Sequence, residues 1–325
     1  MSALAHLVMA IGRRVMMAIP VVMAIVVLTF VLIRLSPTDP AVLLAGDAPA
    51  PEFLERIRAQ YHLDESIAKQ LTIYVASALQ GDLGMSIYFR KPVIELILEH
   101  APVTFLLTIS SLVMASAIGV SLAVLAASRP GTPTDTAVTA LSLAGYSMPA
   151  FWIGQLLILT FSVWLGWLPS NGMGSTRETF EGFELFLDRI RHMALPVTSL
   201  VLFELAIVTR FTRAAMVQAL RQDYVAVAHA KGASPARVLW RHALPNALVT
   251  TVTVLGLEFG FLLAGSVVTE IVFGWPGLGR LFFDAIFRRD FPLLTGCFIF
   301  TSVMVVLANM ITDALVTVID PRTAR

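Results

Sequence analysis

The chain has 325 residues, of which 57% are apolar and only 14% are charged, and its mean hydropathy is +0.80. Soluble domains carry a charge on about a quarter of their residues, so this composition excludes a soluble globular protein. The net charge of +1 is too small to indicate nucleic acid or a strongly acidic ligand as a partner. The sequence therefore predicts an all-α membrane protein that crosses the bilayer several times.

Apolar runs of at least about 18 residues, the length that crosses a bilayer, locate the spans. Together with breakers and charges they predict six transmembrane helices, at residues 12–34, 101–128, 135–165, 194–221, 245–273 and 291–318. The first run is longer than the core of about 7 to 15 residues in a signal peptide, which favours a retained span. Six spans put both termini on one side, and the cations near the span ends favour the cytoplasm.

A segment of ordinary soluble composition separates the first two spans. Its second half predicts an amphipathic helix, since one helical face is apolar and the opposite face is polar. The apolar face holds Ile67, Leu71, Tyr74, Val75, Ala78 and Leu79, and the polar face holds Glu65, Lys69 and Gln70. This helix is interpreted either as a cap on the outer ends of the spans or the lipid interface, or as a docking surface for an extracellular partner.

Signatures of catalysis and of metal binding are missing from the sequence. Gly145-Tyr146-Ser147 begins like a nucleophile elbow, but Pro149 stands where the second glycine is required. No GxxxxGK[ST] loop occurs, so any ATP has to be hydrolysed by another subunit. The histidines are scattered and Cys297 is the one cysteine, so we expect no metal site, no cofactor bound by this chain and no enzyme activity.

The stretch from Arg221 to Asn246 is too polar to span a membrane and too long for a simple helix connection. The sequence predicts a short helix that Gly232 ends, and then a second one that Ser234 caps. Pro245 marks the entry to the fifth span. Two interpretations stay open at this point, a helix pair lying on anionic lipid and an element that binds a cytoplasmic partner.

The spacing Ala228-x3-Gly232-x11-Leu244-Pro245 resembles the cytoplasmic EAA loop of ATP-binding-cassette importer permeases, although the leading glutamate and the isoleucine of that pattern are missing. Further segments resemble the dipeptide/oligopeptide/nickel subfamily of these permeases along nearly the whole chain. They are Arg34–Pro40, Gly81–Ser86, Ser147–Gly154, Gly166–Pro169, Arg221–Tyr224, Glu270–Arg280 and Asp320–Arg322.

This resemblance implies the type I importer permease fold. It divides the chain into an N-terminal segment with the first helix (1–34), a periplasmic segment (35–98), a five-helix permease domain (99–318) that includes the coupling loop (224–243), and a cytoplasmic tail (319–325). It also implies a bacterial inner membrane location, and it implies as partners a second homologous permease, two ATP-binding subunits and a periplasmic solute-binding protein. Membrane lipid surrounds the chain, and nucleic acid is not expected as a partner.

The resemblance implies import of peptides, or of a similar small solute, by alternating access. Nickel, glutathione and oligosaccharide remain alternative cargoes within the family. A self-sufficient secondary transporter or channel is the alternative outside it, although such proteins often show internal repeats and this sequence shows none.

Candidate site residues fall into four groups. The resemblance assigns coupling to the ATPase to Tyr224, Ala228, Gly232, Leu244 and Pro245, with Gly232 fixing the elbow and Ala228 permitting close approach. Glu204 and Glu258 are candidate pathway residues, since an ionisable group near the bilayer centre is costly; a structural role is the alternative. The segment with Glu270, Trp275, Pro276 and Gly277 suits an outer gate or a plain turn. Gly256, Gly260 and Ala264 predict close helix packing.

Overall fold

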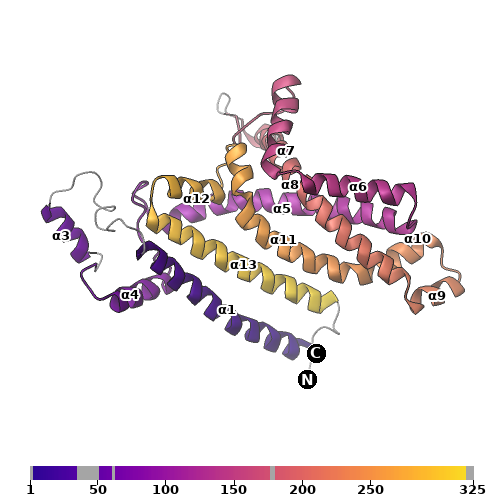
Figure 1. Ribbon diagram of the computed structural model, residues 1–325, viewed down its shortest axis with the longest axis horizontal. Coiled ribbons are helices and arrows are strands. Elements are labelled where there is room, and N and C mark those ends of the chain that lie inside the picture. The colour runs from indigo at the N-terminus through magenta and orange to yellow at the C-terminus, as the bar shows by residue number, and fades with distance from the viewer. Residues whose placement is uncertain (1–2, 35–50, 61–62, 176–179, 320–325) are drawn as a thin grey trace.

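The computed structural model describes residues 3–34, 51–60, 63–175 and 180–319. Within these ranges the regular structure is helical, apart from one isolated antiparallel bridge between Met85 and Pro92. This confirms the all-α class (Figure 1).

The helices follow one another with short connections. They are α1 (Ala3–Arg34), α3 (Pro51–Gln60), α4 (Ile67–Leu79), α5 (Val93–Ser128), α6 (Pro133–Ser147), α7 (Ala150–Leu157), the π-helix η1 (Ile158–Trp164), α8 (Gly182–Leu220), α9 (Asp223–Ala230), α10 (Pro235–Arg237), the π-helix η2 (Val238–Ala243), α11 (Leu244–Val272), α12 (Leu278–Phe287) and α13 (Phe291–Ile319).

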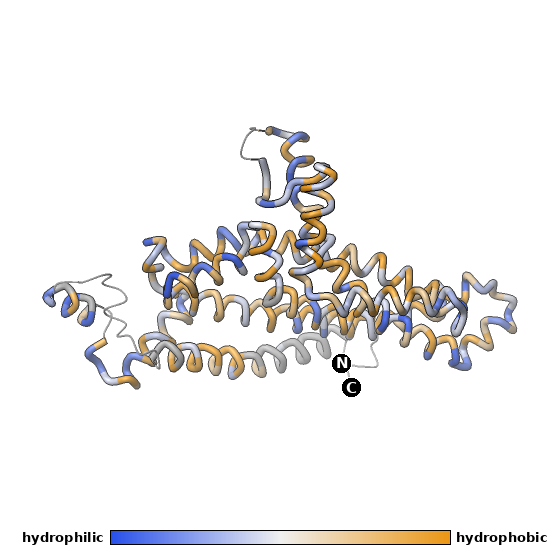
Figure 2. The backbone as a smooth tube through the Cα atoms, turned by 45° about the horizontal axis from the view of Figure 1, so that its top comes forward, coloured by the Kyte–Doolittle hydropathy of each residue, from blue (hydrophilic) through white to orange (hydrophobic). Residues whose placement is uncertain are grey.

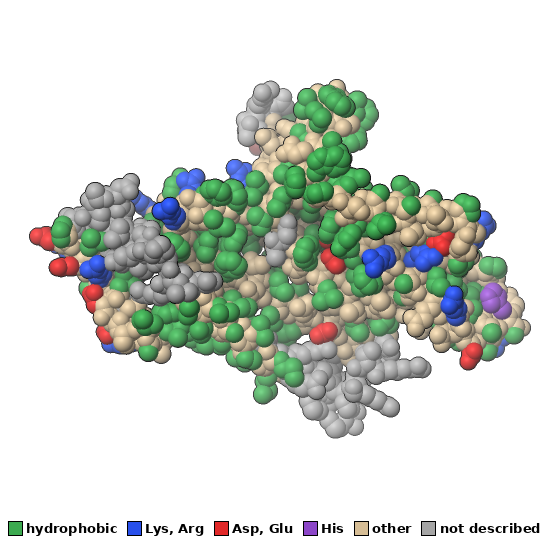
Figure 3. All heavy atoms as spheres, in the orientation of Figure 1, with side chains coloured by type: hydrophobic (Ala, Val, Ile, Leu, Met, Phe, Trp, Pro, Cys, Tyr) green, Lys and Arg blue, Asp and Glu red, His purple; other side chains and the backbone are tan. Residues whose placement is uncertain are grey.

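Long apolar helices form the body of the molecule. Four of the described helices are each long and apolar enough to cross a membrane: α5, α8, α13 and the continuous helix Pro235–Leu263, which runs through η2 into α11. The bent α6–α7 pair is a fifth candidate if it counts as one span. In α1 the stretch Ile19–Val31 is apolar but shorter than a full span, so the sixth span stays a prediction. Figure 2 shows apolar residues along the middle of the bundle, and Figure 3 shows the charged side chains of one face mostly at its two ends.

The third predicted span, residues 135–165, is broken into two helical segments. α6 ends at Ser147, and α7 begins after Pro149 with its axis turned by 97°. Pro149 lacks an N–H to continue the α6 hydrogen-bond ladder, which explains why the helix ends before it. As a result α7 projects away from the bundle (Figure 1).

Small residues set the distances between neighbouring helices. A Cβ on Gly119 of α5 would come within 2.9 Å of Val208 of α8, so these helices touch where the side chain is missing. Gly256 and Gly260 of α11 lie in the same way against Thr312 and Val305 of α13. Gly256 and Gly260 therefore pack helices as the sequence predicts, and the side chain of Ala264 lies outside the described residues.

The outer amphipathic helix differs in part from its prediction. α4 packs on α1, where Tyr74 meets the ring of Phe30 at 5.7 Å between centroids. Ile67 and Leu79, at the two ends of the apolar face, are 66% and 75% exposed, so they do not pack on the described helices and remain available to lipid or to a partner, as the prediction allows. Gln70, expected in solvent, is buried, and its amide nitrogen donates to the carbonyls of Leu63 and Glu65 at 3.0 and 2.7 Å. Gln70 reverses its expected position because it closes the turn that precedes the helix.

The first residues of α5 also differ from the prediction. α5 begins at Val93, eight residues before the predicted span, so the domain boundary expected after residue 98 falls inside this helix. The added turns belong to a core in which Val93, Ile97, Leu281 and Leu293 are buried together. The end of the bundle that carries α12 thus has a hydrophobic core of its own, formed by α5, α12 and α13.

Candidate functional site

The loop between α8 and α11 is a compact knob at one end of the bundle (Figure 1). α9 ends at Ala230, and Gly232 follows with φ of +78°, a backbone conformation that costs an L side chain strain energy. The Gly232 N–H donates to His229 O at 2.9 Å, and the Ala233 N–H donates to Ala228 O at 3.1 Å. Gly232 therefore makes the elbow that the sequence predicts.

Ala228 has a different place from the one expected. Its side chain is 7% exposed and packs with Val225 and Val238 in a small core between α9 and η2. This core holds the two arms of the elbow together. Ala228 thus permits close approach within the knob, rather than offering a surface to a partner.

The far arm of the knob leads into α11 without a break. Ser234 Oγ caps this arm by accepting from the Arg237 N–H at 3.4 Å. Leu244 is buried, whereas Pro245 is exposed. Pro245 stands in the first turn of α11, where the missing backbone N–H of a proline costs no helical hydrogen bond. The Tyr224 hydroxyl bonds to the Asn246 side chain, and partial burial raises the pKa of Tyr224 above its usual value. Tyr224 thereby joins α9 to α11.

The free surface of the knob combines apolar and basic side chains. Tyr224, Val227 and Trp240 are exposed apolar groups, with exposed fractions between 37% and 53%. Exposed cations lie on the same short segment; they are Arg221, Lys231, Arg237 and Arg241. A rigid surface that mixes aromatic and arginine side chains is typical of a protein interface.

At the opposite end, the turn after α11 is built around Glu270. Its side chain is fully buried, and Oε1 accepts from Thr104 Oγ1 at 2.7 Å and from Ser266 Oγ at 3.2 Å. Oε2 accepts from the Arg280 N–H at 2.9 Å. The carboxylate therefore caps the first turn of α12, where anions are favourable, and ties it to α5.

Trp275 and Gly277 complete this outer turn. Trp275 is fully buried, and its indole N–H donates to Val103 O of α5 at 3.1 Å. A Cβ on Gly277 would lie 2.5 Å from both Glu270 Oε2 and Thr104 Oγ1, so only glycine fits there. Pro276 is exposed at the tip. The predicted outer turn is a fully bonded junction between α11, α12 and α5.

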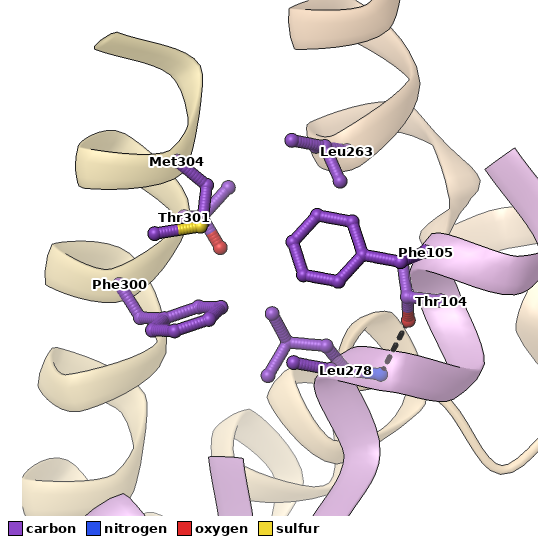
Figure 4. A pocket seen from close by; sticks show the side chains of 8 residues that line it. Thr104, Phe105, Leu263, Leu278, Phe300, Thr301 and Met304 are labelled. Atoms are coloured by element: carbon purple, nitrogen blue, oxygen red, sulfur yellow. Dashed lines mark hydrogen bonds between the residues drawn. The ribbon is translucent and has the colours of Figure 1, made fainter. Parts of the chain in front are cut away.

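A small apolar cleft lies beside this junction (Figure 4). Phe105, Leu263, Phe300 and Met304 point into it, while Thr104 Oγ1 turns away to accept from the Leu278 N–H at 2.7 Å. Its free volume of about 10 Å³ holds at most one water molecule. The cleft is therefore a packing defect rather than a cargo site.

A second outer junction was not foreseen from the sequence. Asp290 precedes α13, and its Oδ2 accepts from Ser86 Oγ at 2.5 Å and from the Tyr88 N–H at 3.1 Å. Its Oδ1 caps α13 by accepting from the Leu293 N–H at 3.2 Å. Arg288 lies 3.5 Å above the ring of Tyr88. Nothing in the sequence links these positions, which are about 200 residues apart.

Glu204 and Glu258 lie in the middle of the bundle. Glu258 is the central residue of α11, and Glu204 is near the middle of α8. Glu204 is fully buried, and neither of its oxygens has a hydrogen-bond partner among the described residues. Arg210, the nearest cation along α8, does not pair with Glu204 and lies over the ring of Phe211 at 5.8 Å.

The comparison with known protein families agrees with this arrangement. Residues 119–325 match the family described as binding-protein-dependent transport system inner membrane component, and residues 7–108 match the N-terminal family of the same membrane components. The chain belongs to this family. It is thus an importer permease, a transport component rather than an enzyme, and ATP hydrolysis resides in separate subunits.

Relatives of the permease match along almost its whole length. The di/tripeptide transport system permease protein DppB of Pseudomonas aeruginosa is 40% identical, over 96% of this chain and 97% of that protein. The oligopeptide transport system permease protein AppB of Bacillus subtilis is 38% identical, over 95% and 97%. The dipeptide transport system permease protein DppB of Escherichia coli is 37% identical, also over 95% and 97%.

Solved structures support the fold of the permease. Its chain superposes on the MetNI methionine ABC transporter in an inward-facing conformation with a TM-score of 0.56 and 19% identity. The match covers 69% of the permease and 96% of the other chain. The type I importer permease fold is therefore confirmed.

One further contact in the permease escaped the sequence analysis. Arg213 of α8 holds Asp135 at the start of α6 through both carboxylate oxygens, with Nη2 donating at 2.6 Å. Asp135 also accepts from the Gly131 N–H at 2.9 Å. This pair fixes the first turn of α6 beside α8. The residues are 78 positions apart, and their charges alone gave no reason to pair them.

Proposed function

We propose that this permease carries di- or oligopeptides into the cell. The observation that carries the proposal is the identity of 37 to 40% with peptide permeases over at least 95% of both lengths. Peptides are thus favoured over nickel, glutathione and oligosaccharides. The chain itself would bind no cofactor, since ATP and magnesium are used by its partners.

The same proposal includes the assembly and its orientation. A second homologous permease, two ATP-binding subunits and a periplasmic solute-binding protein would complete the importer in a bacterial inner membrane. A cytoplasmic N-terminus and C-terminus would put the α9–α10 knob in the cytoplasm and the α12 junction outside. The exposed cations of the knob support this orientation, because cytoplasmic loops are rich in lysine and arginine.

Within the assembly, the knob would couple ATP hydrolysis to movement of α8 and α11. Its two arms share a core, and its ends continue directly into these two helices. Tyr224, Gly232, Leu244 and Pro245 would keep the knob rigid, and Ala228 would close it from inside. A force on the exposed face then reaches both helices together.

Substitution of Gly232 tests the coupling role. No atom lies within 4 Å of a Cβ at this position, so the backbone strain at φ +78° is the main cost of a side chain. Gly232→Asp should leave the permease inserted yet uncoupled, and Gly232→Val should do so more strongly, because β-branched residues tolerate positive φ least. Gly131→Val is the matched control, since Gly131 has φ of +75° and equal free space. Normal ATP-driven uptake by Gly232→Val would refute the coupling role.

The remaining candidate residues would have two roles, lining the transport pathway and forming the outer gate. Glu204 and Glu258 would line the pathway between α8 and α11. The junction with Glu270, Trp275, Pro276 and Gly277 would move as one piece with α12 at the outer gate, because its polar groups are bonded to one another.

Purification from the native bacterium tests the proposed function. A tagged permease in mild detergent should bring two ATPases, a second permease and a binding protein, identified by mass spectrometry. Deletion of the gene should then abolish uptake of labelled di- and tripeptides, and the wild-type gene should restore it. Recovery of the chain alone from a complex shown to survive the detergent, or unchanged peptide uptake in the deletion strain, would overturn the proposal.

A further inference from the structure

The contact between α8 and α11 brings Glu204 and Glu258 to the same level. Near the inner end, Thr212 Oγ1 and Thr251 Oγ1 share a hydrogen bond of 2.9 Å. Farther out, the rings of Phe203 and Phe261 stack at 6.4 Å between centroids. The two helices are antiparallel, so two turns outward from the threonine pair lead to Glu204 on one helix and Glu258 on the other.

Glu204 is buried, and none of the described residues forms a hydrogen bond or an ion pair with its side chain. Leu200 and Val208, about one turn away on either side, are buried apolar residues, and Gly119 of α5 packs against Val208. Both oxygens of Glu204 lack hydrogen-bond partners among the described residues. Buried polar groups in proteins are almost always hydrogen-bonded. An unpaired acidic side chain inside a membrane protein therefore indicates a site for a ligand that binds transiently. Glu258 is only partly buried. The contact between α8 and α11, called the seam below, is therefore accessible from the side of Glu258.

Aromatic rings lie beside the two carboxylates. Tyr146 of α6 stacks on Phe203 at 5.4 Å, and Phe203 stacks on Phe261. Phe203 adjoins Glu204 in the sequence, and Phe261 is one turn from Glu258. Tyr146 and Phe261 are 48% and 59% exposed, so the described residues of this chain leave their edges and faces uncovered.

This combination suits an organic cation better than a metal ion. Ammonium groups bind to carboxylates and to the faces of aromatic rings. Calcium and magnesium require about six or more oxygen ligands, whereas no group of three or more acidic, histidine or cysteine side chains that could hold a metal ion occurs in the described part of the chain. Buried apolar residues of the two helices, among them Leu200, Val201 and Leu262, lie along the same contact.

We propose that Glu204 and Glu258 bind the primary ammonium group of the cargo while it crosses the membrane. The inference rests on the proposed peptide function and adds that the permease itself recognises the amino end of the peptide. The knob joins α8 directly to α11, so its movement can separate the two helices and uncover Glu204. Glu258 is then the first contact for the cargo, and Glu204 becomes accessible as the seam opens.

Photocrosslinking in the complete importer, reconstituted in proteoliposomes, tests this site. Two tripeptides of one composition carry benzoylphenylalanine either first or last in the sequence, with a free amino end in both. Illumination during ATP turnover should crosslink the first peptide to segments of α8 and α11 around the two glutamates. The second peptide should give about tenfold less product there, the ratio expected for loss of one charge-assisted contact.

Charge-neutral variants show whether the carboxylates cause this preference. Glu204→Gln and Glu258→Gln should each reduce the preference about tenfold. Glu204→Asp and Glu258→Asp should keep most of it. Glu184→Gln is the matched control, because Glu184 is exposed at the outer end of the same helix, α8. ATPase activity of the assembled complex verifies folding, and Glu258→Gln, which changes a partly exposed residue, serves if Glu204→Gln fails to assemble.

The outcomes separate this inference from the proposed function. Peptide uptake by the wild type with equal crosslinking of both probes, or a preference unchanged in both glutamine variants, would overturn the ammonium site and leave peptide transport standing. A wild-type complex that takes up neither peptide but takes up another class of solute would contradict the proposed function, and the inference with it.

Discussion

Two glutamates in this permease are equally buried but have opposite surroundings. Glu270, at the outer junction, accepts hydrogen bonds from Thr104, Ser266 and the backbone of Arg280. Glu204, in the middle of α8, has no hydrogen-bond partner among the described residues. Both side chains have zero exposure. Burial alone therefore does not separate these two acids, whereas the hydrogen bonds to their carboxylate oxygens do.

The difference reflects what each region has to do during transport. The outer junction connects α5, α11 and α12, and a saturated carboxylate holds such a connection in one geometry. An unpaired carboxylate destabilises the state in which it is buried, so it favours any state in which it meets a cation. Glu270 therefore fixes the junction, and on the proposal above Glu204 favours the conformation in which it meets the cargo.

Removing Glu270 should have the largest effect on stability. Glu270→Leu leaves the Thr104 and Ser266 hydroxyls and the Arg280 N–H without their acceptor in a buried site. We expect a loss of about 3 kcal/mol or more, seen as a lower midpoint in thermal unfolding of the purified complex. Glu184→Leu, at an exposed position, is the control. An unchanged midpoint for Glu270→Leu would mean that the junction does not hold the outer end.

Adding one methyl group to the same junction should have the next largest effect. In Gly277→Ala the new Cβ would lie 2.5 Å from Glu270 Oε2 and Thr104 Oγ1, so the carboxylate has to shift. Overpacking of this kind costs about 1 to 3 kcal/mol. Gly12→Ala in α1 meets no atom within 4 Å and should be neutral in the same thermal assay. Equal midpoints for the two variants would contradict the tight packing of the turn.

The second outer junction should respond more weakly. Ser86→Ala removes one hydrogen bond to Asp290, but the Tyr88 and Leu293 N–H groups still bond to that carboxylate. We expect a loss of about 1 kcal/mol in the thermal assay. Ser121→Ala, whose hydroxyl is exposed, should change nothing measurable. A loss as large as that of Glu270→Leu would show that Asp290, not Glu270, dominates the outer end.

Removing Glu204 should have the smallest effect on stability and the opposite sign. Glu204→Leu replaces an unpaired buried acid by an apolar group of similar size, so the thermal midpoint should stay equal or rise. ATP-driven peptide uptake should fall in the same preparation. A clear drop in the midpoint would show that the Glu204 carboxylate has a stabilising partner in the assembly.

The sequence predicted the helical spans and the Gly232 elbow because these features are local. Apolar runs and glycines act within a few residues, whereas the break at Pro149 divides a stretch that was predicted as one span. The inward position of Ala228 and the burial of Gln70 were not predictable in this way, since they depend on which face a short helix turns to its neighbours.

The contacts between residues far apart in the sequence could not be predicted either, because they also depend on how the helices pack. Ser86 with Asp290, and Asp135 with Arg213, are pairs of common residue types whose partners are chosen by the tertiary fold. Glu204 and Glu258 could be selected because charge inside an apolar run is conspicuous by itself. That the two glutamates lie at the same level of the α8–α11 contact is known only from the structure, through the Thr212–Thr251 and Phe203–Phe261 contacts.

The most direct test compares Glu204→Gln with Glu270→Gln in the complete importer, with thermal midpoint and ATP-driven peptide uptake measured on the same preparations. Both changes replace a fully buried carboxylate by an amide of the same shape. The predicted result is that Glu204→Gln keeps the wild-type midpoint and loses uptake, whereas Glu270→Gln lowers the midpoint. Full uptake by Glu204→Gln, or an equal loss of stability in both variants, would contradict the division between a structural and a functional glutamate.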